Sequence, residues 1–185
     1  LAEAIIEAVD ADYQHGVVFD DCAAAHAEML RAAVRSAERG RLAIVDRHWI
    51  SEQIYGPVAR GRSQYDALVA ETFDSIFKKH GALYILCVPA DSTGQLERWR
   101  REKAAGRAEY LTESQVDEVI LRYYDLARGN VTCVGDLYTD VLTRAGGFVA
   151  RDDAIIYDLD VDGGTLETFV GKALDKLETL RATRG

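Results

Sequence analysis

A short and almost unbroken apolar run, residues 82–88 (ALYILCV), most constrains how this chain can fold. The run is too short to cross a membrane, and apolar residues occupy both of its faces, so a strand there needs cover on both sides. The apolar segments 42–45 and 154–159 are predicted to be strands of the same kind. We therefore expect a sheet that lies between layers of helices.

The segments between these runs have the spacing of amphipathic helices, which we predict over residues 1–9, 22–39, 64–79, 112–127 and 165–180. Asp20 or Asp21 is placed to cap the second helix, and Gly40 is placed to close it as a C′ residue. Ser63 is placed to cap the third helix, and Thr112 with Gln115 matches a capping box. The remaining predictions are a turn over 10–16, a short strand over 17–19, a helix over 51–55 that Gly56-Pro57 interrupts, and a short helix over 136–144.

This order of elements predicts a single α/β domain over residues 1–185, with a mostly parallel sheet and helices on both faces. The formal net charge of −9 disfavours non-specific binding to DNA or to anionic membranes, although a local basic patch can still bind phosphate. No apolar run has the length of a membrane span. The three cysteines lie far apart without metal-ligand spacing, so we expect a reducing, cytoplasmic location.

The pair Asp46-Arg47 follows directly after the predicted strand 42–45. In open α/β sheets, ligands bind at the carboxyl ends of the strands. A guanidinium donates two parallel hydrogen bonds to phosphate, and a carboxylate beside it can orient a hydroxyl, accept its proton or hold Mg²⁺. The alternative on position alone is a structural ion pair at the end of a strand.

A second candidate is the charged segment 93–112, which is predicted to form a lid. It concentrates cations in a chain that is acidic elsewhere, and Arg98 and Arg101 are three residues apart and share a helix face. Lids of this kind neutralise charge on a transferring phosphoryl group. Because Glu97 and Glu102 interleave with the cations, a solvated, salt-bridged helix is the alternative interpretation.

Aromatic residues accompany the Asp46 segment. Trp49, Tyr55 and Tyr65 could stack on a base, and packing in the core or at its rim explains such residues equally well. A phosphate-cradling loop of the form GxxxxGK[ST] is not in the sequence, since the only Gly-Lys pair, Gly171-Lys172, lies within a predicted helix.

The segments VDRHWISEQIYGP and ERWRREKAAGRAEYLT resemble the Asp-Arg segment and the arginine-bearing lid of thymidylate-kinase-like P-loop kinases, which include deoxynucleoside and phage deoxynucleotide kinases. The resemblance implies a three-layer P-loop kinase-like fold. The first helix would be the one that follows the phosphate loop, so we expect the first strand and that loop to be missing from this sequence. It also implies transfer of the ATP γ-phosphate with Mg²⁺.

The resemblance further implies a role for particular residues. Asp46 would be the Mg²⁺-linked or base carboxylate, and Arg47 would bind the phosphate of acceptor or donor. The implied lid arginines are Arg98, Arg101 and Arg107, and the implied acceptor residues are Asp20, Asp21, Trp49, Ser51 and Tyr55.

The acceptor is expected to be a deoxynucleotide or deoxynucleoside. One alternative is a phage kinase acting on a hydroxymethylated base in DNA, which the acidic charge disfavours. The other alternative is a non-catalytic relic that serves as a binding module. Because related enzymes are often dimers, a homodimer stays an open expectation.

Overall fold

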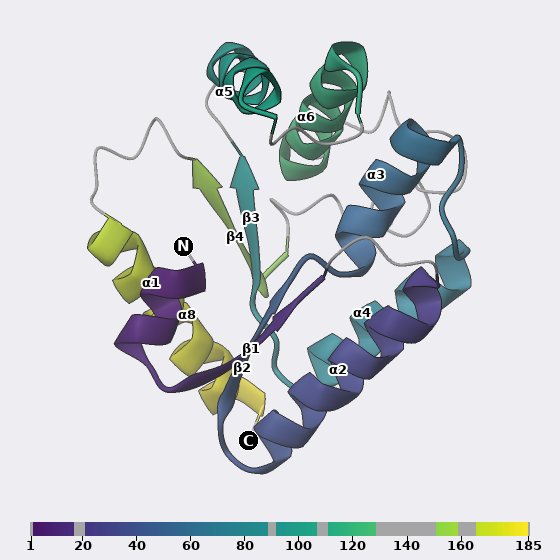
Figure 1. Ribbon diagram of the computed structural model, residues 1–185. Coiled ribbons are helices and arrows are strands. Elements are labelled where there is room, and N and C mark those ends of the chain that lie inside the picture. Colours follow the sequence, from purple (N-terminus) through teal and green to yellow (C-terminus); the bar gives the residue numbers. More distant parts are fainter. Residues whose placement is uncertain are drawn as a thin grey trace. The chain divides into compact units, whose positions relative to one another are not determined.

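The computed structural model describes residues 2–16, 21–88, 92–106, 111–128, 151–158 and 166–184. Its elements confirm a mixed α/β chain (Figure 1). They are α1 (Ala2–Ala8), β1 (Ala11–His15), α2 (Cys22–Glu38), β2 (Leu42–Asp46), α3 (Trp49–Arg60), α4 (Ala67–Lys79), β3 (Tyr84–Val88), α5 (Ser92–Ala104), α6 (Glu113–Arg128), β4 (Ala154–Asp158) and α8 (Leu166–Arg184).

The chain divides into two compact units, which are described separately. Unit 1 comprises residues 1–53, 63–84 and 164–185, and unit 2 comprises residues 54–62 and 85–163. The described strands form two separate two-stranded sheets, β1-β2 and β3-β4. A single mostly parallel sheet is therefore not what the structure shows.

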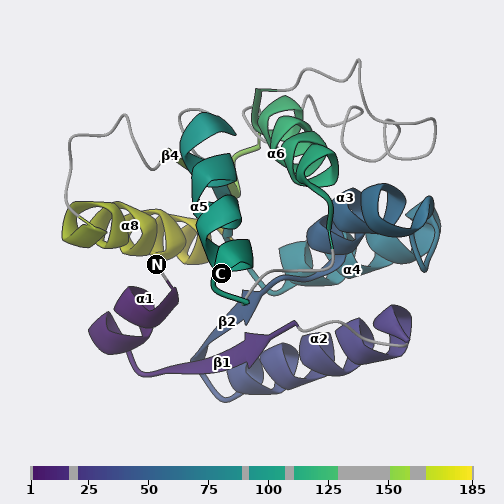
Figure 2. The same ribbon diagram turned by 45° about the horizontal axis from the view of Figure 1, so that its top comes forward.

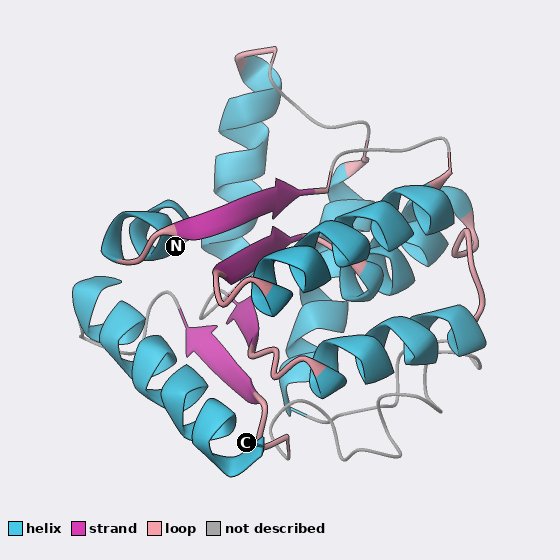
Figure 3. Ribbon diagram, turned by 90° about the horizontal axis from the view of Figure 1, so that it is seen from below, coloured by secondary structure: helices cyan, strands magenta, loops and turns pink. Residues whose placement is uncertain are grey.

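Unit 1 is built on the parallel pair β1-β2, whose register places Ala11 opposite Leu42 and His15 opposite Asp46. The two strands run in the same direction in Figure 3. Helix α2 packs against both strands and against α4, and α1 packs against both strands and α8. The core of this unit includes Met29, Leu30, Phe73 and Phe169.

Capping residues fix the ends of the unit 1 helices. The Asp21 carboxylate accepts a hydrogen bond from the Ala24 amide at 3.0 Å, which confirms one of the two predicted caps of α2. Gly40, with a φ of +75°, ends that helix as expected. Helix α4 begins after Asp66, which accepts from the Val69 amide, rather than after Ser63. Ser63 instead bonds to side chains at the start of α3.

Two sequence predictions about this region are wrong. Residues 11–15 form strand β1 rather than a turn, while the predicted strand 17–19 and Asp20 lie outside the described residues. Helix α3 begins at Trp49 and continues through Pro57 to Arg60 instead of stopping at Tyr55. The residue before a proline normally clashes with its ring through its Cβ, and Gly56 has none.

Unit 2 contains the β3-β4 pair and the helices α5 and α6, which pack side by side (Figure 2). The capping box is confirmed, because the Thr112 amide donates to the Gln115 side chain at 2.9 Å and the Gln115 amide donates to the Thr112 hydroxyl at 3.4 Å. Arg151 and Asp153 form a buried bidentate pair at 2.8 and 3.0 Å before β4. The predicted helix over 136–144 lies outside the described residues.

Candidate functional site

The carboxyl ends of β1 and β2 carry a cluster that we call the strand-end cluster, made of Tyr13, His15, Asp46 and Arg47. Because His15 and Asp46 are register partners and Tyr13 precedes His15 by two residues, the three side chains lie on one face of the sheet. The Tyr13 hydroxyl donates to Asp46 Oδ2 at 2.8 Å, and His15 Nδ1 lies 3.1 Å from the same oxygen.

The cluster is open to solvent. The Tyr13 residue is 42% exposed, and the side chains of His15 and Asp46 are 42% and 41% exposed. Partial burial raises the pKa of Tyr13, as do the hydrogen bond to Asp46 and the negative charges of Asp46 and Glu3, while Arg47 opposes them. Tyr13 is therefore a neutral hydrogen-bond donor to Asp46 at physiological pH.

Arg47 has a left-handed backbone with φ of 62°, the one non-glycine residue with positive φ in the described part of the chain. Such a conformation costs an ordinary side chain roughly 1–2 kcal/mol and persists only where the surroundings impose it. Gly16 provides that constraint. Its amide donates to the Asp46 carbonyl at 2.8 Å, and a Cβ at Gly16 would lie 2.4 Å from the Arg47 carbonyl oxygen.

A buried histidine pair packs in the core of unit 1, made of His26 on α2 and His48, which follows Arg47 directly in sequence. The rings of His26 and His48 stack at 4.5 Å between centroids, with Phe73 and Phe77 edge-on to His48. Nε2 of His48 lies 2.8 Å from the His26 carbonyl, which can only accept, so Nε2 carries the hydrogen. Nδ1 of His48 has no partner within the described residues.

Burial is also the main cause of the unusual titration of this pair. Burial and, to a smaller extent, the neighbouring His26 ring lower the pKa of His48 to about 3, against the opposing effect of the hydrogen bond to the His26 carbonyl. Burial likewise lowers the pKa of His26, against a smaller opposing effect of Glu52. Both rings are therefore neutral at physiological pH, and the chain that follows Arg47 is anchored in an apolar environment.

A second buried network fixes the start of α3. The Glu52 carboxylate is almost inaccessible and accepts from the Gln64 amide at 2.7 Å and from the Cys22 thiol at 3.4 Å. The Gln64 side chain in turn accepts from the Cys22 amide at 2.9 Å. These contacts join the first turns of α2 and α3 to the segment that leads into α4, close in sequence to the strand-end cluster.

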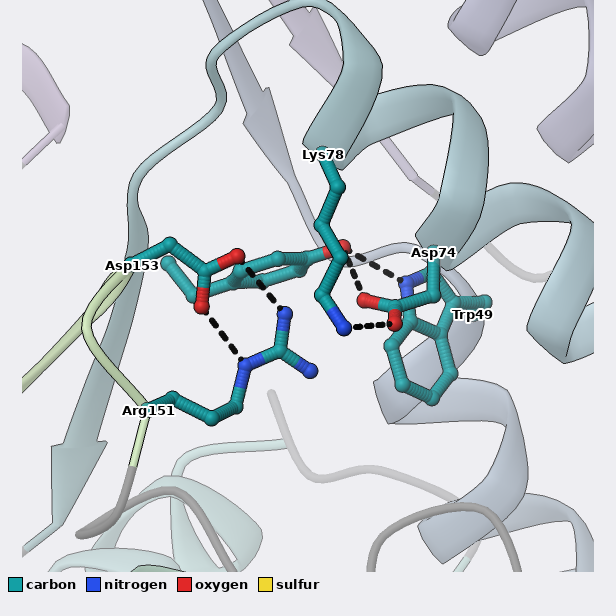
Figure 4. Close-up of polar contacts among 6 residues, drawn as sticks. Trp49, Asp74, Lys78, Arg151 and Asp153 are labelled. Atoms are coloured by element: carbon teal, nitrogen blue, oxygen red, sulfur yellow. Dashed lines mark hydrogen bonds and ion pairs between the residues drawn. The ribbon is translucent and has the colours of Figure 1, made fainter. Parts of the chain in front are cut away.

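Trp49 is part of the core, with 1% exposure, and so is not available to stack on a base. Its indole nitrogen donates to the Tyr84 hydroxyl at 3.4 Å. That hydroxyl donates to Asp74 at 2.8 Å, and Asp74 accepts from Lys78 at 2.9 Å (Figure 4). Core packing, the alternative explanation for this aromatic residue, is the one the structure supports.

The other predicted acceptor residues are less exposed or otherwise engaged. The Asp21 carboxylate caps α2, and Ser51 is half-buried in the first turn of α3. Tyr55 belongs to unit 2, where its ring meets that of Tyr123 edge-on at 6.4 Å. Asp20 and Arg107 lie outside the described residues.

The predicted lid residues lie on α5 in unit 2. Arg100 pairs with Glu113 and Lys103 lies over the Trp99 ring at 4.5 Å, so part of the helix is salt-bridged as the alternative interpretation holds. Arg98 and Arg101 are exposed, and neither makes an ion pair with any residue that the structure describes. The structure therefore brings Asp46 and Arg47 together with Tyr13 and His15, and places the lid arginines in the other unit.

The sequence patterns predicted only two of the four members of the strand-end cluster. Asp46 and Arg47 were found because they follow an apolar strand. Tyr13, His15 and Gly16 were not, because the strand that carries them is polar. Their spacing is the signal that could have found them, since residues two apart on a strand share a face.

The described residues do not make a metal site. No group of three or more His, Cys, Asp or Glu side chains among them could hold a metal ion. At Asp46, two hydrogen bonds converge on Oδ2, while no described residue binds Oδ1.

No protein-family model, curated protein or solved structure matches this chain. Within the residues that the structure describes, none of the helices is long and apolar enough to cross a membrane.

Proposed function

We propose that the strand-end cluster is the acceptor side of a phosphotransferase site, in a nucleotide or nucleoside kinase of the thymidylate-kinase-like type. The substrate is a deoxynucleotide or deoxynucleoside, and ATP is the phosphate donor. The fold that goes with this function is a three-layer P-loop kinase-like domain, to which both strand pairs would belong.

The left-handed conformation of Arg47 is the observation that carries the proposal. A structural ion pair at a strand end needs no strained backbone, whereas Arg47 has one. Backbone strain that the surroundings impose is concentrated at functional sites. Gly16 and the β1-β2 register impose it here, at the residue that follows the exposed carboxylate of Asp46.

The chemistry of the residues supports a phosphorylated or hydroxylic ligand. Arginine binds phosphate through two parallel hydrogen bonds. Asp46 Oδ2 is held by Tyr13 and His15, while no described residue binds its Oδ1, so that oxygen can accept from an acceptor hydroxyl. Arg98 and Arg101 on α5 are the proposed lid, since they are exposed cations without ion pairs to described residues.

The test is phosphoryl transfer from γ-labelled ATP by the full natural protein, with deoxynucleosides, deoxynucleotides and hydroxymethylated duplex DNA as acceptors. We expect transfer to a free nucleoside or nucleotide. Arg47→Ala should lower kcat/KM by about 10²–10³-fold, roughly 3–4 kcal/mol, as for other donors that stabilise developing charge. Arg100→Ala is the matched control, since it removes a surface arginine that pairs with Glu113 and that the proposal places outside the site.

An unchanged kcat/KM in Arg47→Ala removes that residue from the site. Transfer only to modified DNA would replace the free acceptor by a DNA base. Acceptor binding without transfer to any substrate would favour the binding module over the kinase.

A further inference from the structure

We propose that His15 is a catalytic residue of this site, the general base that takes the proton of the acceptor hydroxyl, and that Asp46 holds its ring in the competent tautomer. The inference rests on the proposed function, which it deepens by naming the proton acceptor. It assigns Asp46 an orienting role in place of direct proton abstraction.

The hydrogen-bond geometry fixes the tautomer. His15 Nδ1 lies 3.1 Å from Asp46 Oδ2, and a carboxylate can only accept hydrogen bonds. Nδ1 therefore carries the hydrogen, and Nε2 presents its lone pair. No residue in the described ranges binds Nε2, so the lone pair can accept a proton from a bound hydroxyl. A carboxylate that orients an imidazole in this way is the arrangement of the aspartate–histidine pair in hydrolytic triads.

Tyr13 supports this arrangement from the same face of the sheet. Its hydroxyl donates to the oxygen that holds His15, and its ring stacks on the imidazole at 6.1 Å with an interplanar angle of 25°. Because the pKa of Tyr13 is raised, the hydroxyl keeps its hydrogen. The other charged groups that act on Tyr13 are Glu3 from α1 and Arg47.

The proposed step transfers the γ-phosphoryl group of ATP to the acceptor hydroxyl. The acceptor oxygen forms a bond to the γ-phosphorus, and the bond from that phosphorus to the bridging oxygen of ADP breaks. The hydroxyl proton moves to His15 Nε2, and the resulting imidazolium is stabilised by the Asp46 carboxylate. The proton then leaves Nε2 for solvent, to which the side chain is 42% exposed.

The tautomer is tested directly, without activity, by ¹⁵N chemical shifts of the histidine ring nitrogens in the whole protein near pH 7.5. We expect His15 to be protonated at Nδ1 and bare at Nε2, and we expect Asp46→Ala to abolish that preference. His80, an exposed histidine, serves as the internal reference. A hydrogen on Nε2 in the wild-type protein would overturn the inference.

Kinetics separate a base from a positioning residue. Asn places an amide nitrogen where Nδ1 stands, so His15→Asn keeps the donor to Asp46 and removes the base. General bases contribute about 10²–10⁴-fold, so we expect kcat to fall at least 100-fold in both His15→Asn and His15→Ala, with the acceptor KM little changed. The pH profile of kcat/KM should lose one ionisation in both variants.

A His15→Asn enzyme that keeps wild-type kcat would overturn the assignment, since a donor to Asp46 would then suffice. If the wild-type protein transfers phosphate to no acceptor, the proposed function fails. In that case the ring-nitrogen shifts still decide whether the aspartate–histidine pair exists.

Discussion

The strand-end cluster and helix α5 carry the arginines that the proposed function uses, yet they are built differently. In the cluster, Asp46 accepts two hydrogen bonds and Arg47 has a strained backbone that Gly16 imposes. On α5, Arg98 and Arg101 extend from an ordinary helix into solvent. Hydrogen bonds and a constrained backbone therefore pre-organise the cluster, whereas no ion pair with a described residue fixes Arg98 or Arg101.

The largest expected effect concerns the core beside the cluster. His48 stays neutral in the folded protein down to about pH 3, while the unfolded chain protonates it near pH 6.5. The stabilisation is complete above pH 6.5 and falls by up to about 1.4 kcal/mol per pH unit as the pH drops from 6.5 towards 3. Denaturant unfolding at several pH values measures this slope.

The matched variants for that slope are His48→Gln, which keeps a donor to the His26 carbonyl, and His80→Gln at an exposed position. We expect a shallower slope only in His48→Gln. Equal slopes of stability against pH in the wild-type, His48→Gln and His80→Gln proteins would show that His48 is protonated in the folded state.

The next effect contrasts two glycines. Gly16→Ala places a methyl group 2.4 Å from the Arg47 carbonyl oxygen, so the backbone must shift at a cost of about 1–3 kcal/mol. Gly94→Ala in α5 meets nothing within 4 Å and should gain up to about 1 kcal/mol from reduced unfolded-state entropy. Urea unfolding of both variants gives the comparison. Destabilisation of similar size in the two would contradict the tight fit at Gly16.

Replacing arginine by glycine should change the stability by a smaller amount, with opposite signs at Arg47 and at Arg98. Arg47→Gly relieves the left-handed strain and should stabilise the protein by about 1 kcal/mol relative to Arg47→Ala. Arg98→Gly, within α5, should destabilise it by about 1 kcal/mol relative to Arg98→Ala. Thermal unfolding of the four variants tests this, and the same sign at both positions would refute the strain.

The smallest effect is on the salt bridge of α5. Arg100 and Glu113 are both about half exposed, and ion pairs of this kind often contribute nothing measurable. Arg100→Ala should therefore leave Tm unchanged. A clear loss of Tm would mean that α5 depends on this pair and is less adaptable than the contrast above requires.

Local signals made part of this structure predictable. The Asp21 cap, the glycine after α2 and the Thr112 capping box depend on residues within a few positions of one another, and all three are confirmed. The strand-end cluster depends on longer-range contacts, because Tyr13 and Asp46 are 33 residues apart and meet only through the β1-β2 register.

Other features were not predicted because two sequence signals favoured different structures at the same place. A polar segment followed by glycine favoured a turn at 11–15, but pairing with the apolar strand β2 makes it a strand. A proline favoured a helix end at 55, but the glycine before it allows α3 to continue. Burial of Trp49 depends on packing that no pattern near it specifies.

The central claim is that Arg47 and its neighbours bind the acceptor. Titration calorimetry of a deoxynucleoside monophosphate into the 185-residue chain tests it most directly, because it needs neither ATP nor turnover. We predict saturable binding that weakens at least tenfold in Arg47→Ala and is unchanged in Arg100→Ala. Equal affinity in the wild-type and Arg47→Ala proteins, or no binding to the wild type, would contradict the claim.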